Sequence, residues 1–377
     1  MSRKKTGNRA GKAALPSPCK RKVLTSGNEA MAEAALLAGC TFYAGYPITP
    51  QNELIARMAV LMKESGRPFV QAESEIAAIN MVFGAASTGA RAMTSSSSPG
   101  ISLKQEGISY LAGAQLPCVI INVARGGPGL GNIAPSQGDY FQSTRGGGHG
   151  DYFTPVFAPW NVEEAARLVM LAFDVADYYR TPVMVLSDAL IGQMMEPVTF
   201  PESGGFRKKL PPKPWALNGS TGPRPNVVKS FFIKDGDLEL HNQALAKKWK
   251  AIRANEQRAR TYLSGDADLL IVSYGSQARM AKAAVDLVRR DGVRAGLFRP
   301  VSLWPFPEKR LRQAARGGKK VMVVEQSLGQ MVEDVRLALI GVNEDIAFLG
   351  RAGGGIPSPA EIARAAKKLV GPGVGKK

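Results

Sequence analysis

The chain has 377 residues, of which 45% are hydrophobic and 21% charged, a balance typical of folded globular proteins and unlike that of disordered or fibrous chains. One hydrophobic core rarely serves more than about 200 residues, so we expect two domains. No apolar run approaches about 18 residues and no apolar segment follows the basic N-terminus, so the sequence predicts neither a membrane span nor a secretory signal. We therefore expect a cytoplasmic protein.

The net charge is +18, and a large part of the surplus lies at the N-terminus. Residues 1–24 contain eight basic residues and no acidic one, which predicts a basic disordered extension. The rest of the chain then carries +10, an ordinary value for a basic enzyme. The charge alone therefore does not indicate a nucleic-acid-binding protein.

Cysteine and histidine are too few for a metal site built by this chain alone. The three cysteines, Cys19, Cys40 and Cys118, match no disulfide framework, no zinc motif and no iron–sulfur pattern. The only histidines are His149 and His241. Any redox metal centre is therefore expected on another chain.

The first half of the chain predicts an α/β domain, which we place at residues 25–197. Short apolar runs alternate with segments of helical period, the pattern of parallel strands joined by crossover helices. The clearest buried strands are 117–123 and 182–187, with an amphipathic helix over 162–176 between them.

A linker is expected at residues 198–265. Seven prolines lie between residues 197 and 225, so regular structure should stop there. Residues 240–263 lack proline and glycine and are rich in charge, which predicts a surface helix that bridges the two halves.

A second, smaller α/β unit is expected at residues 266–365, followed by a frayed tail at 366–377. In it, predicted strands and helices alternate along the chain, at residues 269–272, 277–290, 295–298, 308–316 and 321–324.

Two common motifs are absent, since the sequence contains neither a GxSxG elbow nor a GxxxxGK[ST] phosphate loop. Gly129–Ala134 matches GxGxxA after a strand, but a dinucleotide fingerprint must open a helix. Pro135 and the residues after it disfavour that helix, so we do not expect a dinucleotide site.

An acidic pair, Glu73 and Glu75, begins a segment of small and apolar residues that extends to Gly84. A carboxyl group facing such a surface would be desolvated and able to share a proton at neutral pH. Acidic residues also favour the first turn of a helix because of its dipole, so a purely structural role stays open.

Polar residues follow three of the predicted strands, where open α/β sheets hold ligands. Thr49 of GYPITP precedes a helix over 51–65, as either a helix cap or a ligand hydroxyl. The TSSSSPG segment at 94–100 precedes another helix and would either bind an anion or cap that helix. Arg125 is either a ligand-binding or a solvated arginine.

Five segments together resemble the α subunit of 2-oxoacid:ferredoxin oxidoreductases. They are GYPITP, the Glu75-to-Gly84 run, TSSSSPG, ARGGPGLG and PSQGDYFQ…GGGHGD. These are thiamine diphosphate enzymes that oxidise 2-oxoacids with coenzyme A. The resemblance is dense over 27–197 and looser over 268–349. It implies an α/β fold with a parallel-sheet pyrimidine-binding domain followed by a transketolase-C-like domain. ESE, SSSSPG and GLGNIAPSQGDYFQ look more similar to the branched-chain (2-oxoisovalerate, or 3-methyl-2-oxobutanoate) type than to the 2-oxoglutarate type, which stays the alternative substrate.

The resemblance implies roles for particular residues. Glu75 matches the glutamate that hydrogen-bonds the pyrimidine of the cofactor, with Glu73 secondary, and Thr49 and Arg125 match residues that bind the 2-oxoacid. The other residues that the resemblance places at the cofactor are Tyr46, Ile48, Ser97 and Ser98.

The resemblance also implies partner chains. This sequence lacks a GDG followed by a distant Asn, the signature that holds the cofactor's diphosphate through magnesium. Diphosphate, magnesium and an iron–sulfur cluster are therefore expected on a β subunit, accompanied by a γ subunit, a ferredoxin-like δ subunit and ferredoxin as acceptor. An anion-binding or nucleic-acid-binding module without catalysis is the alternative from another class.

Overall fold

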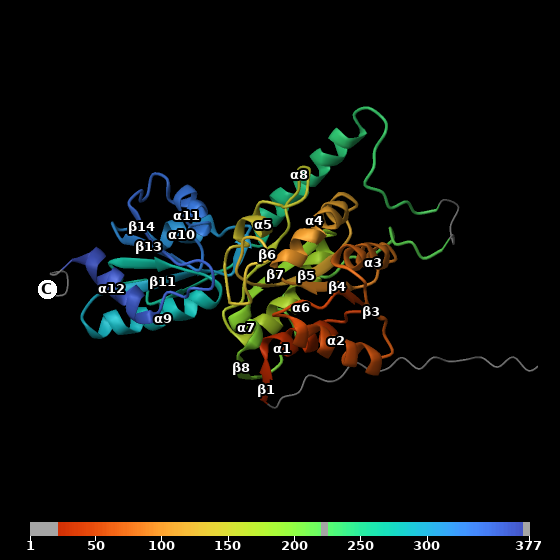
Figure 1. The fold of residues 1–377 in the computed structure, drawn as a ribbon. Coiled ribbons are helices and arrows are strands. Elements are labelled where there is room, and N and C mark those ends of the chain that lie inside the picture. The colour runs from red at the N-terminus through yellow and green to blue at the C-terminus, as the bar shows by residue number, and fades with distance from the viewer. Residues whose placement is uncertain (1–21, 220–224, 372–377) are drawn as a thin grey trace, which may run out of the picture.

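The computed structural model describes residues 22–219 and 225–371. Nearly all of the predicted N-terminal extension, and the last six residues of the predicted tail, lie outside the described part. Within it the chain forms two α/β units, each with its own sheet, as the alternating sequence pattern predicts (Figure 1).

The first unit contains a seven-stranded sheet in the order β12-β6-β7-β5-β4-β2-β3. All its neighbouring strands run parallel except the edge pair β12 and β6. Its strands are β2 (Phe42–Gly45), β3 (Phe69–Gln71), β4 (Ala92–Ser96), β5 (Cys118–Ala124), β6 (Val156–Phe157), β7 (Pro182–Asp188) and β12 (Ser302–Trp304). The central strands β5 and β7 are buried along their whole length, which explains their nearly continuous apolar sequence.

Helices cover both faces of this sheet: α1 packs against α2 and α6, and α3 packs against α4 (Figure 1). The helices of the unit are α1 (Gly27–Leu37), α2 (Asn52–Glu64), α3 (Glu75–Ser87), α4 (Ser98–Gly113), α5 (Tyr140–Thr144), α6 (Val162–Tyr179) and α7 (Ala189–Gln193). A separate antiparallel pair joins β1 (Val23–Ser26) to β8 (Met195–Val198), so the start and the end of the unit lie side by side.

The second unit contains a five-stranded sheet in the order β14-β13-β10-β11-β9, parallel except for β9. Its strands are β9 (Ala259–Tyr262), β10 (Leu269–Val272), β11 (Ala295–Pro300), β13 (Lys320–Glu325) and β14 (Ile346–Gly350). The helices in the second half of the sequence are α8 (Asp237–Asn255), α9 (Gly275–Arg290), α10 (Glu308–Ala314), α11 (Met331–Leu339) and α12 (Pro359–Val370). Helices α9 and α12 pack together on one side of the sheet, and α10 and α11 on the other (Figure 1).

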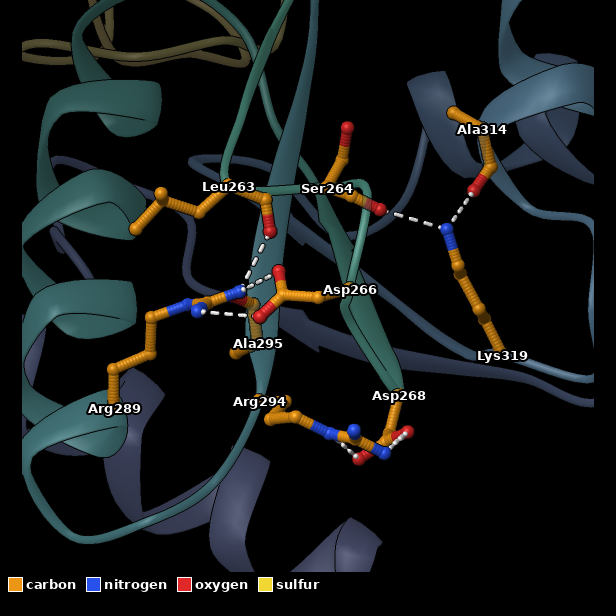
Figure 2. A network of polar contacts seen from close by, with 9 residues as sticks. All are labelled: Leu263, Ser264, Asp266, Asp268, Arg289, Arg294, Ala295, Ala314 and Lys319. Atoms are coloured by element: carbon orange, nitrogen blue, oxygen red, sulfur yellow. Dashed lines mark hydrogen bonds and ion pairs between the residues drawn. The ribbon is translucent and has the colours of Figure 1, made fainter.

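Ion pairs fix the turn between β9 and β10 at the edge of this sheet (Figure 2). Arg289 of α9 binds both carboxylate oxygens of Asp266, at 2.7 and 3.1 Å, and donates to the carbonyl of Leu263 at 2.8 Å. Arg294 likewise donates hydrogen bonds to both carboxylate oxygens of Asp268. The backbone of Leu263 is left-handed, with φ of 47°, a conformation that residues other than glycine rarely adopt. These contacts therefore stabilise a strained turn.

Three predicted boundaries were wrong. The charged helix ends at Asn255 rather than residue 263, because residues 259–262 pair with β11 as the strand β9. Helix α12 continues to Val370, into the predicted tail, since its apolar side chains pack against α9. Strand β12 lies in the predicted second unit but joins the first sheet, where Trp304 stacks on Phe153 with ring centroids 4.8 Å apart.

Candidate active site

The predicted site residues converge at the carboxyl ends of three neighbouring strands, β5, β4 and β2. The loop after β2 carries Thr49, the turn after β4 carries Ser97 and Ser98, and Arg125 directly follows β5. Arg125 joins the three segments, because its guanidinium donates to the Thr49 carbonyl at 2.9 Å and its backbone N–H donates to the Ser98 hydroxyl at 2.9 Å. The structure therefore brings together residues up to 76 positions apart.

Glu75 is the first residue of α3 and is 6% exposed. Ser74 caps this helix by accepting a hydrogen bond from the Ala77 N–H at 3.2 Å, so Glu75 is not needed as the cap. Glu73 precedes the helix and is exposed. Of the two acids, only Glu75 is enclosed by protein, and in the described part of the chain no group hydrogen-bonds its carboxylate.

Gly100, in the first turn of α4, lies directly against Glu75. A Cβ atom at this position would come within 2.6 Å of Glu75 Oε1 and 2.1 Å of Ser96 Oγ. Because only glycine fits, the Glu75 carboxylate lies against bare backbone at the start of α4. This contact ties the acid to the serine-rich turn.

Replacing Gly100 by Ala is expected to displace the Glu75 carboxylate and to lower kcat/KM of the assembled enzyme by at least about tenfold, at a stability cost of about 1–3 kcal/mol. Gly84→Ala is the matched control, since nothing lies within 4 Å of the new methyl group and the change sits within α3. The control should retain activity and gain about 0.5–1 kcal/mol. Equal kinetics for both variants, measured with chemical denaturation of each, would refute this assignment.

The serine-rich turn contains hydroxyl groups without partners. Among the described residues, the buried side-chain oxygens of Thr94, Ser96 and Ser97 make no hydrogen bond. Ser97 occupies the N-cap position of α4, yet its side chain does not cap the helix. The cap interpretation of this turn is therefore wrong for Ser97, and its hydroxyl is available to a ligand.

Arg125 is 7% exposed, so it is not a solvated surface arginine. Besides the Thr49 carbonyl, its guanidinium donates to the Leu130 carbonyl at 3.1 Å, whereas its buried Nε has no partner among the described residues. In this arrangement Arg125 connects the two loops that border the site, and its Nε–H can still donate to another acceptor.

Thr49 is partly buried and does not cap the following helix. The N-cap position is Gln51, whose side chain instead accepts from the Ser95 hydroxyl at 2.6 Å and donates to the Tyr46 carbonyl at 3.2 Å. Among the described residues, the Thr49 hydroxyl accepts only from the Asn52 side chain, at 3.3 Å. Ile48 is partly buried in the same loop.

Sequence reasoning missed Lys104, which is fully buried in α4 and donates from Nζ to the Glu75 carbonyl at 3.2 Å. Desolvation lowers the pKa of Lys104 to about 8, although the negative charge of Glu75 acts in the opposite direction. A signal was present, because Lys104 shares the helical stripe of Ile101, Ile108 and Leu111.

The pH dependence of stability should report this buried lysine. Its pKa is 10.5 when unfolded and about 8 when folded, so the unfolded chain binds more protons between these values. The free energy of unfolding therefore rises as the pH increases from about 8 to 10.5, by about 3 kcal/mol at most. Below about pH 8 this contribution is lost, because the folded chain must then hold a buried charged lysine. Lys104→Met should remove this rise between pH 8 and 10.5. The free energy of unfolding of each protein is measured by chemical denaturation across this pH range. The same pH dependence in both proteins would contradict the expectation.

The segment Gly129–Ala134 does not open a helix, because the next helix, α5, starts at Tyr140. Within the described residues, no three His, Cys, Asp or Glu side chains form a group able to hold a metal ion. In the same part of the chain, no helix is both long and apolar enough to cross a membrane.

Large apolar side chains border the site on its exposed side. Ile76 of α3 and Leu103 of α4 are each 50% exposed, and Leu130 and Ile133 of the loop after β5 are 81% and 61% exposed. Exposed apolar side chains from three adjacent segments are typical of a surface that another chain covers.

Two family models match this chain. The thiamine diphosphate-binding model of pyruvate flavodoxin/ferredoxin oxidoreductases matches residues 33–260, and the pyruvate:ferredoxin oxidoreductase core domain II matches residues 267–362.

Named relatives agree with these matches. The chain is 47% identical to the ketoisovalerate oxidoreductase subunit VorB of Methanothermobacter marburgensis, over 92% of this chain and 98% of the relative. It is 37% identical to the 2-oxoglutarate synthase subunit KorA of Methanothermobacter thermautotrophicus, over 91% and 97%. A solved 2-oxoglutarate:ferredoxin oxidoreductase from Magnetococcus marinus superimposes with a TM-score of 0.82 at 25% identity, covering 93% of this chain and 66% of that one. A split-gene transketolase shares the fold alone, with a TM-score of 0.54 at 14% identity.

Proposed function

Because this chain belongs to the family of 2-oxoacid:ferredoxin oxidoreductase subunits, we propose that it holds the pyrimidine end of thiamine diphosphate, with Glu75 as the acid–base residue. The observation that carries the proposal is the position of Glu75, an enclosed carboxyl group without a hydrogen-bond partner in the described part of the chain. It lies beside a glycine that leaves backbone bare and beside buried hydroxyls that lack partners. All the candidate residues lie within the stretch matched by the thiamine diphosphate-binding family model.

The chain's own groups suit this task. A carboxyl group in a pocket with little water can share its proton with a ring nitrogen and return it. The Ser96 and Ser97 hydroxyls would satisfy polar atoms of the same ring system, and Tyr46, Ile48 and Ser98 would fix its surroundings. When bound, thiamine diphosphate supplies the nucleophilic carbon for the 2-keto group and takes up the electrons left when carbon dioxide departs.

Substrate binding would fall to Arg125 and Thr49. The free Nε direction of Arg125 offers a charge-assisted hydrogen bond to the 2-oxoacid carboxylate, and the Thr49 hydroxyl lies on the loop that Arg125 holds in place. Released from the Leu130 carbonyl, the guanidinium would present two parallel N–H groups to the carboxylate.

The enzyme needs partners for the rest of the reaction. We propose that a cytoplasmic complex supplies magnesium, the diphosphate site and the iron–sulfur cluster on a β subunit, with γ and δ subunits and ferredoxin as acceptor. The apolar border formed by Ile76, Leu103, Leu130 and Ile133 supports a partner seated over the cofactor. On this basis the isolated chain should be inactive.

We propose a branched-chain 2-oxoacid as substrate, with coenzyme A as acyl acceptor. The support is the higher identity to the ketoisovalerate relative, 47% against 37% and 40% for two 2-oxoglutarate synthase subunits. The assembled complex should give the highest kcat/KM with 2-oxoisovalerate when 2-oxoisovalerate, 2-oxoglutarate, pyruvate and an aryl-pyruvate are compared using a viologen dye as acceptor. Preference for 2-oxoglutarate would overturn the substrate, and turnover with none of the four would overturn the function.

A further inference from the structure

We propose that a basic groove between the two units binds a small polyphosphate anion, such as the diphosphate portion of a nucleotide. The groove has a volume of about 490 Å³ and lies between α6, residues 204–208 and residues 255–260. Six cationic side chains line it: Arg167, Arg207, Lys208, Arg258, Arg260 and Arg310. None of them belongs to the site around Glu75.

The two acidic residues of the groove are already neutralised. Glu164 is held by Arg299, which donates to both carboxylate oxygens at 2.7 and 2.8 Å. Glu256 accepts from Arg258 at 2.9 Å and from the Tyr179 hydroxyl at 3.0 Å, with Lys208 Nζ 3.9 Å away. Neither carboxylate is therefore available to the other arginines.

Four cations of the groove remain without a strong partner. Among the described residues, Arg207, Arg260 and Arg310 have no carboxylate within 4.0 Å, and Arg310 donates only to the Ala259 carbonyl, at 3.0 Å. The one carboxylate within 4.0 Å of Arg167 in the described part of the chain is that of the exposed Glu163, at 3.7 Å. Four like charges around one groove create a positive potential that favours an anion there, and the surplus matches the charge of a polyphosphate.

Close packing fixes the backbone that forms one wall of the groove, although Arg207, Lys208, Arg260 and Arg310 are themselves exposed. Gly204 lies so close to α6 that a Cβ atom there would meet the Leu171 backbone nitrogen at 2.2 Å. Gly205 follows with φ of 81°, a left-handed turn that suits glycine. This turn directs Arg207 and Lys208 along α6, and Phe206 packs edge-on against Tyr178 with ring centroids 5.3 Å apart.

The chemistry favours phosphate. Planar guanidinium groups bind phosphate oxygens through two parallel hydrogen bonds, and arginine contributes five of the six cations. The volume lies within the range of about 300–1,000 Å³ that is typical of small-molecule sites. Linear diphosphates therefore match the groove in both size and charge.

Titration of the full-length chain with pyrophosphate and with ADP, by calorimetry at about 0.15 M salt, tests the proposal. We expect saturable binding that weakens at least tenfold in the double variant Arg207→Gln/Arg260→Gln. The control Arg336→Gln/Lys247→Gln removes the same charge from exposed positions outside the groove and should bind as the unmodified chain does. Absence of saturable binding, or equal loss in both double variants, would overturn the proposal.

Competition identifies the source of the anion. If coenzyme A displaces pyrophosphate, the phosphates of the acyl acceptor occupy the groove. If coenzyme A does not displace it, a separate phosphorylated metabolite occupies the groove. Either result supports a polyphosphate site. Glu75→Gln should leave pyrophosphate binding unchanged, so this test and that of the proposed function fail independently.

Discussion

Glu75→Gln should lower turnover of the assembled enzyme by about 10²- to 10⁴-fold, the contribution of a well-placed acid–base group. Glutamine keeps the size of the side chain but cannot exchange a proton at this position. Because Glu75 lies at the helix start while Ser74 provides the cap, the change should leave folding and subunit assembly intact. Steady-state kinetics with the preferred 2-oxoacid, combined with size-exclusion chromatography of the complex, measures both.

The control for this prediction is Glu73→Gln. Glu73 precedes α3 and is exposed, so its substitution should change turnover less than about threefold and stability by less than about 0.5 kcal/mol. If both variants lose the same activity, Glu75 is not the acid–base residue.

Removing the ion pair between Glu164 and Arg299 should have the largest effect on stability. Glu164 on α6 and Arg299 on β11 join the two units through two hydrogen bonds of 2.7 and 2.8 Å, with side chains 11% and 4% exposed. Arg299 also lies over the Trp160 ring, 4.6 Å from its centroid. Glu164→Gln leaves a buried charge without its counterion, so we expect a loss of about 3–5 kcal/mol in unfolding free energy.

Two further variants separate charge from packing. Glu163→Gln, on the neighbouring exposed residue, should change stability by less than about 0.5 kcal/mol, because its 3.7 Å contact with Arg167 is open to solvent. The double variant Glu164→Gln/Arg299→Met should recover part of the lost stability, since no unpaired charge remains. An unfolding midpoint for Glu164→Gln equal to that of Glu163→Gln would show that the pair does not join the units.

Local pattern was enough to predict the architecture and to place the candidate residues at one edge of the first sheet. The buried runs of β5 and β7 and the helix between them follow from apolar periodicity, and the polar segments after β2, β4 and β5 converge because these strands are parallel neighbours. The motifs around Thr49, Glu75 and Arg125 supplied the family, which the family models and relatives confirm.

Two of the three features missed by sequence reasoning depend on contacts between distant residues. Strand β12 joins the first sheet through β6 and the stacking of Trp304 on Phe153, which no local pattern reveals. The basic groove assembles α6, a glycine turn and β9 from sequence positions about a hundred residues apart, so its arginines looked like ordinary surface charge. Lys104 was overlooked because a lysine is rarely expected in a buried stripe.

The proposed reaction depends on Glu75 as the residue that exchanges a proton with the bound cofactor. Hydrogen–deuterium exchange at C2 of bound thiamine diphosphate, followed by NMR in the assembled complex without substrate, tests this before any substrate or electron acceptor is involved. We expect the Glu75→Gln variant to bind the cofactor but to slow the exchange by at least about 100-fold. Exchange at the unmodified rate with the cofactor bound would contradict it.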